Sequence, residues 1–180
     1  MKKQDTRELL LDSAFQTFYK QGFQGANIAT ILSDVGINKG SMYHFFKSKK
    51  ELGLAVVKER IERNLVNKYS KIVEEKESFI NLFDTLRSAP ETLPYGCPLN
   101  KFSQEMLYID DEFKILLTGA YNIFESLIIK ILEKEKISDA QTKAQLIIAS
   151  YEGALMIYHL NQNKENFKTL LTTLQEQVHY

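Results

Sequence analysis

The chain of 180 residues contains few residues that interrupt helices. It has eight glycines and three prolines, and no alternating apolar–polar segment is followed by a hairpin dipeptide. Its single cysteine excludes an intrachain disulfide and fits a reducing compartment. These absences favour an all-α fold over a strand-rich one.

Motifs for catalysis, metal binding and export are missing as well. His44, His159 and His179 have no partner at ligand spacing, and no glycine-rich phosphate loop or nucleophile beside a histidine occurs. The first residues lack the apolar core of a secretory signal, and no apolar run approaches the roughly 20 residues of a membrane span. We expect a cytoplasmic protein that is not an enzyme and uses no cofactor, metal or membrane.

The net charge of zero conceals an uneven distribution. Residues 1–50 hold eight Lys and Arg against four Asp and Glu, a net +4, whereas residues 51–180 hold 15 against 19, a net −4. A basic end and an acidic far end suit a protein that presents one end to DNA. Because the charge is modest, useful affinity would require two such ends.

Residues 27–51, NIATILSDVGINKGSMYHFFKSKKE, contain the start and stop signals of two short helices joined by a tight turn, followed by the start of a third helix. Asn27 and Asn38 are good N-caps, and Gly36 supplies the left-handed residue that commonly ends a helix. Ser48 and Glu51 have the spacing of a capping box. The pattern predicts a helix-turn-helix unit.

The second of these helices is expected from Lys39 to about Lys47 and has apolar and polar residues on opposite faces. Met42, Phe45 and Phe46 should pack inward. Polar side chains on its opposite face and at neighbouring caps can bond phosphate oxygens and base edges. The residues predicted to contact DNA are Asn27, Thr30, Lys39, Gly40, Ser41, Tyr43, His44 and Lys49. The alternative is an ordinary helical hairpin with a solvated polar face.

Residues 36–52, GINKGSMYHFFKSKKEL, resemble the signature of the TetR/AcrR family of bacterial transcription regulators. The positions in register are Gly36, Gly40, Tyr43, Phe46, Lys49 and Leu52. Asn27 departs from the family's usual Thr, and Leu32 from its usual Ala. The resemblance implies about nine helices, with a three-helix DNA-binding head in residues 1–48 and a helical bundle for effector binding and dimerisation in residues 49–180.

The last two expected helices, one capped by Ser138 and one over residues 164–178, carry more apolar surface than one core needs. The resemblance implies that they form a symmetric dimer interface; one larger monomer core is the alternative. The residues predicted for the interface are Ile148, Gly153, Leu155, Phe167, Leu171 and Leu174. A two-fold dimer would require a near-palindromic operator.

The resemblance also implies an effector pocket in the second domain. Its predicted lining is aromatic and apolar: Phe79, Phe83, Leu86, Cys97, Phe102, Met106, Tyr121, Phe124, Tyr151 and Tyr158. Such a pocket suits a small apolar or aromatic effector, although any single residue could equally belong to the core.

Residues 88–98 contain all three prolines, which predicts a loop with Pro98 at the first position of the next helix and Cys97 as its cap. A helix start favours thiolate at Cys97. The stretch GCPLN and the following SQEM resemble a TetR-type subset that responds to electrophiles or small unsaturated acids. The alternative is a buried apolar cysteine.

We therefore expect a dimeric transcriptional regulator, acting as a repressor on double-stranded DNA. A small apolar, aromatic or electrophilic effector, or modification of Cys97, would release it. The main rival is an architectural DNA-binding protein that ignores effectors.

Overall fold

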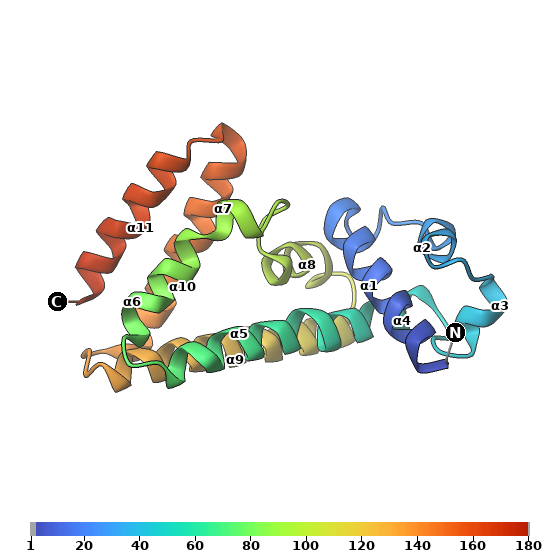
Figure 1. The fold of residues 1–180 in the computed structure, drawn as a ribbon, viewed down its shortest axis with the longest axis horizontal. Coiled ribbons are helices and arrows are strands. Elements are labelled where there is room, and N and C mark those ends of the chain that lie inside the picture. Colours follow the sequence, from blue (N-terminus) through green and yellow to red (C-terminus); the bar gives the residue numbers. More distant parts are fainter. Residues whose placement is uncertain (1–2, 180) are drawn as a thin grey trace. The chain divides into compact units, whose positions relative to one another are not determined.

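The computed structural model describes residues 3–179. These residues contain helices and no strand, which confirms the all-α prediction. The chain divides into two compact units, one made of residues up to 64 plus 101–120, the other of residues 65–100 plus those from 121 onward (Figure 1). This contact division differs from the predicted functional boundary after Ser48, since residues 49–64 and 101–120 pack with the N-terminal helices.

The first unit contains the predicted helix-turn-helix. The elements of this unit are α1 (Lys3–Gln21), α2 (Ile28–Val35), α3 (Lys39–Tyr43), α4 (Lys49–Val56) and η1 (Val57–Glu62), with parts of α8 (Pro98–Met106) and α9 (Asp111–Lys134). Its core is aromatic: the Phe23 ring centroid lies 5.1 Å from that of Phe18 and 5.0 Å from that of Phe113. Phe102 meets Phe18 edge-on at 6.2 Å, so the segment 101–120 completes this core. Phe45, predicted to face inward, is only half-buried.

The predicted starts of α2 and α3 and the predicted end of α2 are confirmed. The side-chain oxygen of Asn27 accepts from the Ala29 N–H at 2.8 Å, and that of Asn38 accepts from the Ser41 N–H at 2.8 Å. Gly36 has a φ of 71°, the left-handed conformation in which other residues are strained.

Two details near α3 differ from the prediction. The helix ends at Tyr43 rather than near Lys47, because the N–H groups of Phe45 and Phe46 both turn back to the Met42 carbonyl and carry Phe46 into the core. In the capping box, the Glu51 N–H donates to the Ser48 hydroxyl as expected, but the Glu51 carboxylate accepts from the Lys47 N–H instead of that of Ser48.

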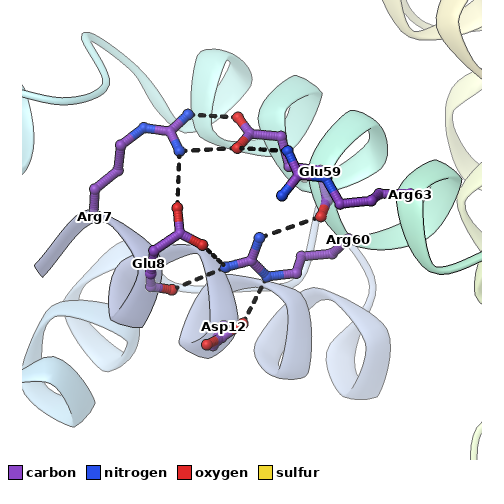
Figure 2. Close-up of polar contacts among 6 residues, drawn as sticks. All are labelled: Arg7, Glu8, Asp12, Glu59, Arg60 and Arg63. Carbon is purple, nitrogen blue, oxygen red and sulfur yellow. Dashed lines mark hydrogen bonds and ion pairs between the residues drawn. The ribbon is translucent and has the colours of Figure 1, made fainter. Parts of the chain in front are cut away.

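A π-helical turn, η1, lies between α4 and α5 (Arg63–Glu74) in one continuous helical run. Figure 2 shows that Glu59 and Arg60, which are neighbours in this turn, both face α1. Arg7 binds the Glu59 carboxylate with two bonds of 2.9 and 2.5 Å, and Arg60 reaches Asp12 at 2.6 Å and Glu8 at 2.8 Å. Isolated surface ion pairs contribute little, but this bidentate, connected network fixes α1 against η1.

The second unit buries a larger apolar core. Its elements are α5, α6 (Ser78–Arg87), α7 (Ala89–Thr92), α10 (Ala140–Asn161) and α11 (Lys164–His179), with parts of α8 (Pro98–Met106) and α9 (Asp111–Lys134). Helices α10 and α11 form an antiparallel hairpin (Figure 1).

The prolines interrupt the helix as predicted, and Pro98 begins α8, but the expected loop contains the short helix α7, which was not predicted. The predicted Ser138 cap is wrong. Asp139, left-handed with a φ of 54°, immediately precedes α10 and makes no side-chain cap bond.

Helix α9 is long and apolar enough to cross a membrane by length and composition alone, contrary to the expectation that no segment would be. Its buried residues explain this composition. Phe113 and Leu117 lie in the core of the first unit, and Ile128, Ile131 and Leu132 in that of the second, so one helix supplies two cores. A core helix passes the same test, so the evidence for a membrane span is weak.

Gly53 in α4 gives a test of the aromatic core. A Cβ there would lie 2.8 Å from Phe113 Cζ and closer still to the Phe23 ring. We expect Gly53→Ala to lower the free energy of unfolding by about 1–3 kcal/mol because the rings must move. Urea denaturation measures this. Gly119→Ala in α9 meets nothing within 4 Å and should instead stabilise by up to about 1 kcal/mol; equal effects of the two changes would contradict the packing described.

Candidate nucleic-acid interface and regulatory residues

The residues predicted to contact DNA gather on the helix-turn-helix, and most are open to solvent. Those with exposed side chains or surfaces are Asn27, Thr30, Lys39, Gly40, Tyr43 and His44. Ser41 is half-buried, and its hydroxyl donates to the Asn38 side chain at 3.1 Å. Ser41 is therefore partly occupied in holding the start of α3.

The exposed face of α3 combines a cation with an aromatic ring. Tyr43 is 49% exposed, and Lys39 Nζ lies 5.9 Å from its ring centroid. A cation at this distance is held over the ring face. The pair offers a phenol hydroxyl and an ammonium to phosphates or base edges. Gly40, between them in sequence, adds no side chain, so a nucleic-acid backbone can approach closely.

Lys49 differs from the other predicted contacts. It is half-buried, its ammonium donates to the Gln24 carbonyl at 3.1 Å, and it lies 5.0 Å from the Phe23 ring centroid. Burial lowers the pKa of this ammonium, and the Glu105 carboxylate partly offsets the shift. Lys49 thus already has partners inside its own unit.

Two family descriptions match the chain. The description of bacterial regulatory proteins of the tetR family matches residues 10–56, the part that contains this exposed face. The C-terminal domain of LmrA/YxaF-like transcriptional regulators matches residues 77–172, more than half of the chain. The chain belongs to the TetR family. It is a DNA-binding transcriptional regulator.

Individual relatives agree over nearly the whole length. An uncharacterised helix-turn-helix regulator from Lactococcus lactis is 28% identical, covering 96% of this chain and 94% of its own. The transcriptional repressor DhaR of a Mycobacterium species is 26% identical over 98% and 93%. The crystal structure of reduced Escherichia coli NemR superposes with a TM-score of 0.81 at 22% identity, covering 96% of both chains, which shows a common fold.

The structure does not bring all of the predicted effector-pocket residues together. Phe102 and Met106 belong to the first unit, where both are buried. The residues that share the core of the second unit are Phe79, Phe83, Leu86, Phe124 and Tyr151, with Cys97 and Tyr158 packed against it. Tyr121 is 37% exposed.

A groove of about 440 Å³ lies elsewhere in the second unit. Phe79 is the one predicted pocket residue in its lining. The other lining residues are Lys76, Glu77, Ile80, Glu135, Gln175, Glu176 and His179. Four of these eight lining residues are charged, unlike those of the apolar pocket predicted from the sequence.

Cys97 lies at the start of α8, where it packs against the apolar core and also meets the Glu152 side chain. The residue is half-buried, but its thiol is enclosed and bonds to the Glu152 carboxyl. The Asn100 side-chain amide donates to the same carboxyl at 2.8 Å. Glu152, which was not predicted as a site residue, therefore links α10 to the Cys97 turn.

Burial raises the pKa of Cys97 well above its usual value, and the negative charge of Glu152 raises it further. Backbone N–H groups of Asn100 and Leu99 lower the pKa, as expected at a helix start, but they are outweighed. The expectation that the helix start favours thiolate is therefore wrong for this conformation. Burial also raises the pKa of Glu152.

The predicted dimer residues are mostly interior. Ile148, Leu155, Phe167, Leu171 and Leu174 are buried in the core of their own chain, and Gly153 is exposed. In the single chain these five side chains belong to the core that α10 and α11 share with α6, so the exposed apolar surface of α10 is formed by other residues.

Besides its buried face, α10 carries a second apolar stripe that was not predicted from the sequence. Its members are exposed and recur at intervals of three and four residues: Leu146, Ala149, Gly153, Met156 and Leu160. Leu170 of α11 is exposed too. The three- and four-residue spacing could have identified this stripe, but α10 is apolar on more than one side.

Glu152→Gln tests the thiol environment. Removing the negative charge should lower the pKa of Cys97, so more thiolate forms at a given pH and alkylation becomes faster. The pH profile of the alkylation rate with iodoacetamide should move to lower pH. Glu91→Gln, a change on the surface, should leave the profile in place. A profile that Glu152→Gln does not move, or moves to higher pH, would contradict the contact.

Proposed function

We propose that this TetR-family regulator is a cytoplasmic homodimeric repressor that occupies a near-palindromic operator and leaves it when an effector binds or Cys97 is modified. The exposed Lys39–Tyr43 face of α3 carries the proposal. It places a cation and a phenol side by side on the second helix of a helix-turn-helix, the element that enters the major groove in this motif. The name of the relative DhaR supports repression.

Within this proposal the operator contacts are divided by role. The exposed side chains of α3, Lys39, Tyr43 and His44, would reach base edges and nearby phosphates. Asn27 and Thr30, at the start of α2, would bond phosphates; the Asn27 oxygen is already occupied as a cap, so its amide group would donate. Because Lys49 already bonds within its own unit, we assign it to holding the α1–α2 turn.

The second apolar stripe of α10 supports the dimer. An exposed row with Gly153 at its centre lets the α10 helix of a second copy approach closely. In a two-fold dimer each copy presents the same row, and the recognition helices would lie about 34–36 Å apart. Such spacing suits two half-sites one turn apart.

Release from the operator would begin in the second unit. The buried Phe79, Phe83 and Phe124 support an apolar or aromatic effector that enters the second unit by displacing core contacts. An electrophile would instead add to Cys97, and the raised pKa of this thiol means that the adduct would form slowly until the Glu152 contact opens. Both routes end in a shift of α8.

Lys39→Gln tests the DNA contact. Operator affinity should fall for all sequences, and the slope of log Kd against log salt should decrease by about one unit, as for one lost phosphate contact. Fluorescence anisotropy over a salt series measures both. Lys71→Gln, on α5 outside the helix-turn-helix, is the control and should change neither. An unchanged slope for Lys39→Gln would remove Lys39 from the contacts.

Leu160→Arg tests the dimer surface. Leu160 is 75% exposed, so the chain should still fold, but charge at the interface should shift the protein to monomers in sedimentation velocity. Binding to an inverted repeat should weaken far more than binding to a half-site. Ile115→Arg changes a residue of α9 that is 74% exposed and should leave the dimer intact. A Leu160→Arg protein that remains dimeric would refute this surface.

A further inference from the structure

The turn between α1 and α2 is held by a carboxylate from far along the chain. After Gly22 ends α1, the N–H groups of Phe23 and Gln24 have no helical carbonyl to donate to. Both donate to Glu105 of α8, at 2.6 Å to Oε2 and 2.6 Å to Oε1. One side chain thus satisfies two successive backbone donors with its two oxygens, and bonds to a charged acceptor are the stronger kind.

Other bonds fix the same turn from the same side. Lys49 donates to the Gln24 carbonyl, and its positive charge interacts with Glu105. Lys101, one helical turn before Glu105, donates to the Tyr19 carbonyl at 2.7 Å at the end of α1. The turn is therefore bonded through both its donors and its acceptors.

The position of this turn matters because α2 begins directly after it. Asn27, the cap of α2, follows Gln24 by three residues, and α3 follows α2 through the tight turn at Gly36. We propose that Glu105 is a positioning residue for operator binding, which fixes the α1–α2 turn and thereby the placement of α2 and α3 against α1. It would touch no DNA.

The other end of α8 extends the role of Glu105 to regulation, and this step rests on the proposed function. Cys97 and Asn100, at the start of α8, bond to Glu152, whereas Glu105 lies in its last turn. A helix transmits displacement along its axis because hydrogen bonds join its successive turns, and Asn100 and Glu105 are separated by only about 7–8 Å of rise. A change at Cys97 that shifts α8 would then pull Glu105 from the turn.

The first test uses Glu105→Gln. Glutamine retains one acceptor oxygen and places its NH₂ group against the second backbone N–H, so one bond is lost and two donors oppose each other. We expect roughly tenfold weaker operator binding with an unchanged salt slope, since no phosphate contact is removed. Amide hydrogen exchange at Phe23 and Gln24 should accelerate while circular dichroism confirms that the protein is folded.

Glu112→Gln is the matched control, since it removes a carboxylate of the same unit that bonds Lys50 instead of the turn. It should leave the operator affinity and both amides unchanged. A folded Glu105→Gln protein with wild-type affinity would overturn the proposal. If that variant does not fold, exchange in the wild type decides: Phe23 and Gln24 amides that exchange at unprotected rates would overturn it equally.

The second test labels Cys97 of the full-length protein with N-ethylmaleimide at alkaline pH, checked by mass, and uses Asn100→Ala as an independent disturbance of the α8 start. Either should accelerate exchange at Phe23 and Gln24 in the wild type, with no further increase in Glu105→Gln. If the Phe23 and Gln24 amides stay protected in the labelled protein and in Asn100→Ala, coupling through Glu105 is refuted. If the Phe23 and Gln24 amides exchange faster while the protein still binds DNA, the coupling is supported and release through Cys97 is refuted.

Discussion

The DNA-binding unit depends on an aromatic core to which distant parts of the chain contribute. Phe18 and Phe23 come from α1 and the turn after it, whereas Phe102 and Phe113 come from α8 and α9. These rings bury large apolar areas and pack in tilted and edge-on pairs, an arrangement that tolerates little displacement. The helix-turn-helix unit therefore shares an aromatic core to which residues from the second half of the sequence contribute.

Ion pairs and hydrogen bonds add to the packing of this aromatic core. Arg7 and Arg60 fix α1 against the π-helical turn η1 (Figure 2). Glu105 fixes the turn that follows α1. π-Turns are uncommon and often occur where function requires a particular side-chain placement. Here the turn directs two successive residues toward one helix. The apolar core sets the packing of α1, and these charged bonds set its orientation.

The surroundings of Cys97 illustrate how opposing effects are resolved by burial. A helix start and two backbone N–H groups favour the thiolate, but an enclosed sulfur beside a carboxyl favours the thiol. The balance leaves a cysteine whose reactivity depends on the contact with Glu152. In this conformation the thiol is therefore kept protonated by its surroundings.

Features fixed by local chemistry were predictable from the sequence. The caps at Asn27 and Asn38, the left-handed Gly36 and the start of α8 at Pro98 each depend on residues within one turn. The TetR signature extended this to the fold and to DNA binding. The Ser138 cap failed because Asp139 takes a left-handed conformation, and the end of α3 moved because Phe46 turns into the core.

Features that depend on long-range packing were not predictable. Glu105 and Glu152 meet partners more than 50 residues away. Glu105 lies in the SQEM stretch that resembles a TetR-type subset, but nothing in that stretch indicates the turn to which it bonds, and no local pattern marks Glu152. On α10, both faces are apolar, so spacing alone could not decide which face packs inside the chain. The predicted interface therefore fell mainly on core residues, and the exposed stripe from Leu146 to Leu160 became visible only with the core assigned.

Native-state hydrogen exchange tests most directly whether residues 101–120 belong to the DNA-binding unit. The account predicts that the slowest amides of α1 and those of residues 101–120 open together, with the same free energy and the same dependence on denaturant. The amides of α10 and α11 should follow a separate opening. If residues 101–120 instead open together with α10 and α11 while α1 stays protected, the central claim is contradicted.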